Sequence, residues 1–228
     1  MSRIVAFFDM DHTIIWENSG HSSVKLARQH GFVSARHLVK GFFKIILYRL
    51  TLLDIETWYE QNIAMLAGLM PDDMERFAEQ WFDELARPTV YKQAYDLVRA
   101  HQDQGHQVVI ISNAPNFFIV PLAKAMQIQH IIGTRLDIKD GRFTGKIVKP
   151  LCYGKGKRDY AVTWAAEQGI DLEQAYFYTD SRFDLAFLTV VGHPVATNPD
   201  VRLRRVARRN GWPIMDFDKV PAFMNLNR

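Results

Sequence analysis

The sequence has only one cysteine among its 228 residues, and its charges nearly cancel. A single thiol, Cys152, excludes an intrachain disulfide and suits a reducing cytoplasm. The 28 basic and 25 acidic residues leave a net charge of +3, which gives no general reason to expect binding to nucleic acid or to a membrane. These scarcities favour a cytoplasmic protein without a nucleic-acid or stable membrane partner.

Long apolar runs are also lacking. The first run, which begins at Ile4, is too short for a signal peptide and stops at acidic residues. The most membrane-like stretch, 41–53, contains Lys44 and Arg49 and is well short of the roughly 20 residues that span a bilayer. It is typical of an amphipathic helix in a packed layer. The most basic stretch, 201–209, has five arginines, and the apolar residues between them favour a solvated helix face.

What remains is a pattern of buried strands and helices. A short strand is predicted over 3–8, followed by roughly four helices over 16–86 with no strand between them. Later segments alternate: helix 89–104, strand 107–112, helix 116–126, an Asp-Gly hairpin within 134–148, helix 156–168 and strand 175–180. This alternation predicts an α/β fold, a Rossmann-like doubly wound parallel sheet. We expect a core domain over 1–15 and 87–228, with 16–86 inserted as a helical cap.

Three of the predicted strands end on polar residues. The first ends at Asp9 with Asp11 two residues on, the second at Ser112 and Asn113, and the third at Asp180. Ligands of open parallel sheets bind beyond the carboxyl ends of the strands, so these side chains would meet if the first strand lay between the other two. Two acids beside a core strand would be costly without partners.

These residue types suit phosphoryl transfer. Asp9 and Asp180 offer the oxygen ligands that Mg²⁺ favours, and Asp9 can attack phosphorus to form an aspartyl-phosphate. Asp11 can protonate the leaving alkoxide and then activate water. Ser112 and the loop that continues at Asn113 can bind phosphoryl oxygens, with Lys157 as a point charge.

Four segments together resemble the haloacid dehalogenase superfamily. They are "DMDHT", the strand that ends in Ser112, "GKGK" ending in Lys157, and "TDSRFD" with Asp180 and Asp184, in family order. The stretches "DGRFTGKI" and "NPD…GWPIMDF" are similar to subfamily IB, which contains phosphoserine-phosphatase-like and histidinol-phosphatase-like hydrolases. The resemblance implies a C1-type helical cap and a Mg²⁺-dependent hydrolase of phosphoric monoesters.

The resemblance also implies roles for individual residues. Asp9 matches the nucleophile and a metal ligand, and Asp11 matches the acid/base, with its carbonyl on the metal. Ser112 matches the phosphate-binding hydroxyl and Lys157 the charge-neutralising lysine, although Lys155 is an alternative. Asp180 matches a direct metal ligand and Asp184 its acidic partner, unless Asp184 is a surface or supporting residue.

The leaving group is the open question. A small phosphorylated metabolite is expected as substrate, with histidinol phosphate and phosphoserine as candidates. Glu17 and Asn18 are the nearest cap residues that can contact it, although they would also serve to cap the first helix of 16–86. Many relatives have an acidic residue near position 18. Two alternatives are a lipid-phosphate hydrolase at a membrane surface and a catalytically silent binding protein on the same fold.

Overall fold

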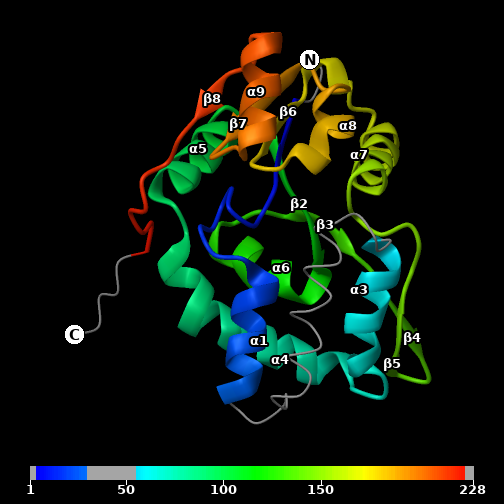
Figure 1. The fold of residues 1–228 in the computed structure, drawn as a ribbon. Coiled ribbons are helices and arrows are strands. Elements are labelled where there is room, and N and C mark those ends of the chain that lie inside the picture. Colours follow the sequence, from blue (N-terminus) through cyan, green and yellow to red (C-terminus); the bar gives the residue numbers. More distant parts are fainter. Residues whose placement is uncertain (1–3, 30–54, 224–228) are drawn as a thin grey trace.

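The computed structural model describes residues 4–29 and 55–223. Its centre is a six-stranded parallel sheet in the order β3-β2-β1-β6-β7-β8 (Figure 1). The predicted parallel α/β fold is confirmed, and the first strand lies between β2 and β6 as expected. The strands are β1 Val5–Phe8, β2 Gln107–Pro115, β3 His130–Thr134, β6 Tyr176–Thr179, β7 His193–Thr197 and β8 Ile214–Met215.

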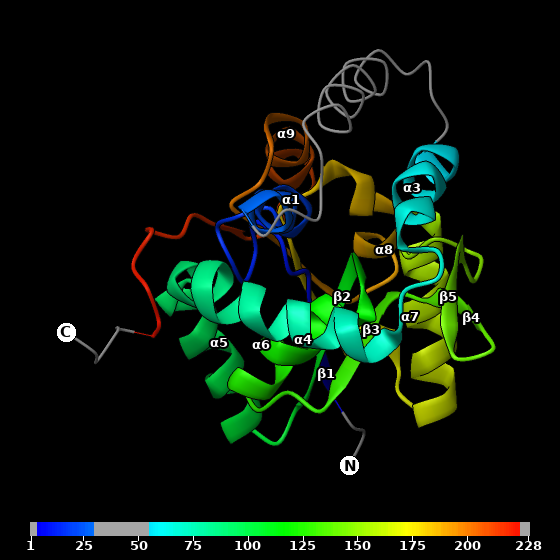
Figure 2. The ribbon, with the colours of Figure 1, turned by 90° about the horizontal axis from the view of Figure 1, so that it is seen from below.

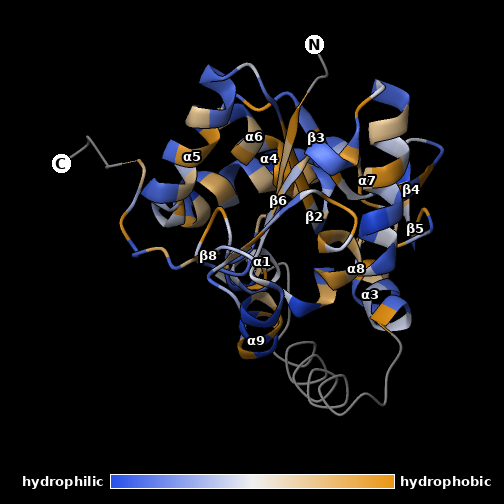
Figure 3. Cartoon of the chain, turned by 90° about the horizontal axis from the view of Figure 1, so that it is seen from above, coloured by the Kyte–Doolittle hydropathy of each residue, from blue (hydrophilic) through white to orange (hydrophobic). Residues whose placement is uncertain are grey.

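Helices cover both faces of the sheet, because β1 alternates its side chains between two cores. Ala6 and Phe8 pack with the helices α5 (Lys92–Asp103) and α6 (Asn116–Ala125). Val5 and Phe7 pack on the other side with α7 (Lys155–Gln168), α8 (Leu185–Leu188) and α9 (Val201–Asn210). Figure 3 shows the apolar strands enclosed between helices that turn their polar sides outward.

Between residues 16 and 86, every regular element that the structure describes is helical, as predicted. These elements are α1 (Ser19–Gln29), α3 (Ile55–Ile63) and α4 (Pro71–Trp81), with the short turns η1 Ala64–Leu66 and η2 Phe82–Ala86, and the turn η3 Arg87–Thr89 follows them. Figure 1 shows α1, α3 and α4 at the opposite end of the molecule from α8 and α9. The helix expected over 34–50 and the apolar stretch 41–53 lie outside the described residues. Within the described ranges, no helix is long and apolar enough to cross a membrane.

Helices α4 and α3 both join this helical segment to the rest of the chain. The Trp81 ring of α4 meets Phe118 of α6 edge to face, with 5.0 Å between ring centres. Helix α3 packs on the hairpin of β4 (Leu136–Lys139) and β5 (Arg142–Ile147), shown together in Figure 2. The hairpin therefore shares a small core with a helix of the predicted cap, while the domain boundaries at 15 and 87 stay a prediction.

Local chemistry explains where elements begin and turn. The Asp-Gly hairpin is confirmed: Asp140 and Gly141 both have positive φ, as a tight hairpin turn requires. Helix α5 begins at Lys92 rather than at 89, because Arg87–Thr89 form a separate 3₁₀ turn that contains Pro88. Strand β2 runs to Pro115, three residues past its predicted end. The remaining 3₁₀ turns are η4 Leu172–Gln174 and η5 Arg182–Asp184.

Candidate active site

Asp9 lies directly after β1 and continues its pairing, since the Asp9 amide donates to the Tyr178 carbonyl at 2.9 Å. The chain then turns sharply. The Met10 carbonyl accepts from the amide of Ile14 at 2.9 Å, and His12 has a left-handed φ of 56°. This turn keeps the Asp9 carboxylate at the carboxyl edge of the sheet, where it is only 7% exposed.

Lys157 is the cation beside Asp9. Its Nζ lies 3.1 Å from Asp9 Oδ1 and 2.8 Å from Asp184 Oδ2, and the residue is 3% exposed. Lys155, the sequence alternative, is exposed on the same helix and does not take part in this cluster. Burial alone lowers the pKa of Lys157, but the charges of Asp184 and Asp9 outweigh burial and raise that pKa. The lysine therefore stays protonated.

Asp184 is held by two donors. Lys157 Nζ contacts its Oδ2, and the Thr179 hydroxyl donates to the same oxygen at 2.7 Å. The Asp184 residue is 1% exposed, so it is not a surface residue. The same Thr179 hydroxyl oxygen lies 3.4 Å from Asp9 Oδ2. These contacts connect the end of β6 to β1 through one hydroxyl and one ammonium group.

The acids together carry more charge than the lysine balances. Burial and, to a lesser extent, the charges of Asp9 and Asp184 together raise the pKa of Asp180 to about 8. The pKa of Asp9 is raised to about 7, because burial and the charges of Asp184 and Asp11 outweigh the opposing effect of Lys157. Four carboxylates around one ammonium group leave an excess of negative charge that a divalent cation would offset. Within 4–29 and 55–223, no hydrogen-bond donor contacts the Asp180 carboxylate.

This donor set fits a hard cation that keeps water ligands. The described residues hold no group of three or more His, Cys, Asp or Glu side chains arranged to bind a metal. Mg²⁺ does not need such a cage, because it is commonly bound by one or two carboxylates together with substrate phosphate and water. Asp9 and Asp180 supply two carboxylates at adjacent strand ends, which is enough for that mode of binding.

Asp11 faces the start of α1 rather than the lysine. Its Oδ1 accepts from the Ser19 amide at 3.0 Å, and its Oδ2 accepts from the Ser19 hydroxyl at 2.9 Å. Burial raises the pKa of Asp11, and the two Ser19 donors oppose that rise. Because the charge of Asp11 also raises the pKa of Asp9, the two acids share one electrostatic site.

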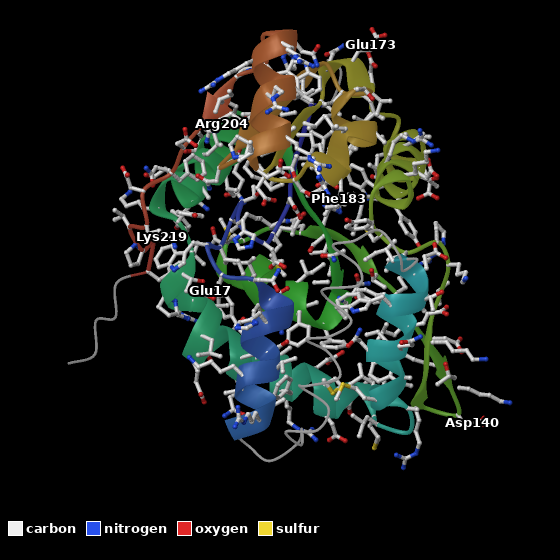
Figure 4. All side chains as sticks on the ribbon, viewed as in Figure 1. Glu17, Asp140, Glu173, Phe183, Arg204 and Lys219 are labelled. Carbon is white, nitrogen blue, oxygen red and sulfur yellow. The ribbon has the colours of Figure 1, made fainter. Side chains whose placement is uncertain are left out.

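Asn18 and Glu17 lie beside this contact, at the amino-terminal end of α1 (Figure 4). The Asn18 side chain caps the helix, since its Oδ1 accepts from the His21 amide at 2.9 Å. Its Nδ2 reaches Asp11 Oδ2 at 3.3 Å. Glu17 is half-buried. Asn18 therefore acts as the N-cap residue of α1. Contact of Asn18 or Glu17 with the substrate stays a prediction.

Ser112 and Asn113 lie in a bulge of β2. Ile111 pairs with Ile132 and Pro115 with Thr134, so β2 has two extra residues between these pairs. The Ser112 side chain is fully buried, and its hydroxyl oxygen accepts from the Ala114 amide at 3.2 Å. The hydroxyl proton of Ser112 is thus available to a phosphoryl oxygen. The Asn113 carbonyl leaves the strand ladder and accepts hydrogen bonds from side chains instead.

The sequence did not point to Ser19 or Thr179, nor to Tyr59 and Thr134, whose hydroxyls donate to the Asn113 carbonyl. Thr179 precedes Asp180 and was available as a polar residue at a strand end. Ser19 is an ordinary serine near a helix start, and only the folded turn after β1 brings it to Asp11. No pattern in the sequence distinguishes it from other serines of the same segment.

The buried pair of Asp9 and Lys157 lies at the carboxyl edge of a doubly wound sheet, with the Asp180 carboxylate and the Thr179 hydroxyl nearby. This arrangement is typical of a hydrolase site of the phosphoryl-transfer class. The sequence matches the model of the haloacid dehalogenase-like hydrolases over residues 6–189, and the chain belongs to that family. It is a phosphoric monoester hydrolase of that family, as its relatives named phosphatases also indicate.

Two curated relatives have named activities. A histidinol-phosphatase of Neisseria meningitidis is 33% identical, over 93% of this chain and 98% of its own. A phosphoserine phosphatase of Mycobacterium tuberculosis is 31% identical, over 93% of this chain and 70% of its own. A solved structure of a Bordetella pertussis protein of unknown function is 29% identical, with a TM-score of 0.87 over 95% of this chain and 99% of its own. A phosphoserine phosphatase with a phospho-aspartyl intermediate analogue shares the fold, with a TM-score of 0.67 at 17% identity over 96% of both chains.

Proposed function

We propose that this phosphatase is Mg²⁺-dependent and hydrolyses a small phosphomonoester through an aspartyl-phosphate intermediate, an acyl phosphate formed on Asp9. The observation that carries the proposal is the Asp9 carboxylate, buried at the end of β1 and 3.1 Å from the Lys157 ammonium. Its Oδ1 accepts from Lys157 and from the Met10 amide, the latter at 2.8 Å, whereas among the described residues Oδ2 has only the long contact to Thr179. Oδ2 is therefore the less restrained oxygen.

The reaction balances over two steps. In the first, an Asp9 carboxylate oxygen attacks phosphorus, the bond from phosphorus to the leaving oxygen breaks, and Asp11 gives its proton to that oxygen. In the second, Asp11 takes a proton from water, the water oxygen attacks phosphorus, and the bond to Asp9 breaks to release inorganic phosphate. The raised pKa of Asp11 suits a group that must carry a proton in one step and lose it in the next.

The other site residues bind and balance charge. Lys157 and the Ser112 hydroxyl would bind phosphoryl oxygens, and Asn113 would continue the same loop. Asp9, Asp180 and the carbonyl of Asp11 would hold Mg²⁺, with Asp184 as the acid behind them. Bound there, Mg²⁺ would supply charge neutralisation for the phosphoryl group. The contacts of Asp184 with Lys157 and Thr179 favour a positioning role over direct ligation.

The leaving group would be read by the helical segment over 16–86. Ser112 and Lys157 are buried, and in this proposal the segment opens to admit a substrate and closes over it to exclude water. Histidinol phosphate and phosphoserine are the two substrates that the named relatives favour. We keep Glu17 and Asn18 as the candidate contacts to the leaving group, and the cytoplasm as the predicted location.

The experiment is a panel of phosphomonoesters assayed with purified protein and Mg²⁺. Histidinol phosphate, phosphoserine, sugar phosphates and an aryl phosphate separate the candidates, and a short-chain lipid phosphate tests the membrane-surface alternative. The proposal expects release of inorganic phosphate from at least one soluble substrate. Release from none of them, while the protein is folded and binds Mg²⁺, would favour the silent binding protein. Glu17→Ala and Asn18→Ala should lower activity selectively on the natural substrate if they read it.

A further inference from the structure

The loop that carries Ser112 is tied to the cap by one hydrogen bond. The Tyr59 hydroxyl of α3 donates to the main-chain carbonyl of Asn113 at 2.7 Å, across a sequence separation of 54 residues. The Thr134 hydroxyl of β3 donates to the same carbonyl at 2.8 Å. One carbonyl of the candidate phosphate-binding loop is therefore held from two sides, once by the helical segment and once by the sheet.

The bulge of β2 explains why this carbonyl needs such donors. Because two extra residues of β2 lie between the pairs to Ile132 and Thr134, the Asn113 carbonyl has no ladder partner from β3. A carbonyl that is partly shielded from water and has no donor would be costly, and Asn113 is half-buried. The two hydroxyls satisfy it and fix the direction of the peptide that follows Ser112. The loop position thus depends on a residue of the cap.

Tyr59 is also firmly placed on its own side. It is 8% exposed and packs in one small core with Ile63, Ile147 and Leu151. Leu151 belongs to the segment that leads to α7 and Lys157. Burial raises the pKa of the Tyr59 hydroxyl, which therefore keeps its proton and remains a donor to the Asn113 carbonyl.

We infer that Tyr59 is a positioning residue, whose hydroxyl fixes the Ser112–Asn113 loop only when α3 is seated on the hairpin. The inference rests on the proposed function of the same site. Phosphate binding would then be coupled to the placement of the cap, because an open cap withdraws one of the two donors to Asn113. Tyr59 acts on the phosphate end of the substrate through Asn113, and it makes no contact with the leaving group in this account.

The test compares three variants that each remove one hydroxyl. Tyr59→Phe and Thr134→Val each delete one of the two hydroxyls that donate to the Asn113 carbonyl. Tyr59→Phe keeps the aromatic ring. Tyr160→Phe is the matched control. The Tyr160 hydroxyl donates to the Pro150 carbonyl at 2.9 Å, and this hydrogen bond does not involve the Ser112–Asn113 loop. For Tyr59→Phe we expect kcat/KM to fall roughly 3- to 10-fold, by the same factor for an aryl phosphate and an alkyl phosphate. Tyr160→Phe should stay within a factor of two of wild type.

Hydrogen exchange supplies a readout that does not need turnover. In Tyr59→Phe the amides of Ser112, Asn113, Ala114 and Asn116 should exchange faster than in wild type, together with those of 55–63. If these four amides are unchanged, or if kcat/KM stays at the wild-type value, the inference is overturned. A loss confined to one leaving group also overturns it, because that result indicates direct substrate contact. If wild type hydrolyses nothing, the proposed function fails, and the exchange measurement still decides the coupling between α3 and the loop.

Discussion

Replacing Lys157 by methionine removes the one ammonium group among four carboxylates and keeps the side-chain volume similar. The Nζ contacts to Asp184 and Asp9, at 2.8 and 3.1 Å, join side chains that are at most 10% exposed. Removing one partner of a buried ion pair costs about 3–5 kcal/mol, since the other charge is left without compensation. We expect a loss of that size in the free energy of unfolding at pH 8, without added metal.

The sign of the pH dependence follows from Asp9. Its pKa is raised from 3.8 to about 7 in the folded protein, so ionisation of Asp9 destabilises the fold as pH rises through that range. Without Lys157 the pKa of Asp9 rises further, and the destabilisation should grow between pH 5 and pH 8. At pH 5 Asp9 carries its proton, so the loss is smaller there.

The loss in the free energy of unfolding is measured by urea unfolding of wild type and Lys157→Met at pH 5 and pH 8, in excess chelator. The exposed neighbour provides the control: Lys155→Met should change the free energy of unfolding by no more than about 0.5 kcal/mol. The double variant Lys157→Met/Asp184→Asn should be less destabilised than the lysine variant alone. A loss for Lys157→Met that is equal at pH 5 and pH 8, or below about 1 kcal/mol at pH 8, would refute the reasoning.

Three further predictions follow from the same contacts. Asp11→Asn should slow hydrolysis of an alkyl phosphate more than that of a nitrophenyl phosphate, and equal losses would contradict its role as acid. Dialysis against chelator should abolish activity, Mg²⁺ should restore it and Ca²⁺ should inhibit; full activity in chelator would exclude the metal. Burial, with the nearby charge of His106, lowers the pKa of His101 from 6.5 to about 4. The contribution of His101 to stability should therefore be lost as pH drops from 6.5 to 4, opposite in sign to that of Asp9, and the free-energy difference between wild type and His101→Gln in urea unfolding should change over that range.

Much of the fold could be predicted because its signals are local. The apolar strands, the Asp-Gly turn and the glycines after the helices depend on neighbouring residues, and the structure fulfils the condition that the first strand lies between β2 and β6. Asp9 and Asp180, at two of the predicted strand ends, also share one electrostatic site, since parallel strands bring their carboxyl ends to one edge. Lys157, which is 3% exposed, points inward, whereas Lys155 is exposed.

The rest could not be predicted because it depends on long-range packing. The contact of Tyr59 with Asn113 needs both the bulge of β2 and the seating of α3 on the hairpin. The hairpin itself was predicted, but nothing in its alternating sequence indicates that it packs against α3 rather than on the sheet. Ser19 reaches Asp11 only because the turn at His12 reverses the chain.

The central claim is that Asp9 is the nucleophile, and acid quenching during turnover tests it most directly. Protein mixed with its best substrate and Mg²⁺ is quenched within the first turnover, digested and mapped by mass spectrometry. The account predicts one added phosphoryl group on the peptide that contains Asp9, its accumulation in Asp11→Asn, and its absence in Asp9→Asn together with loss of turnover. A phosphoryl group on another residue, or undiminished turnover by Asp9→Asn, would contradict the account.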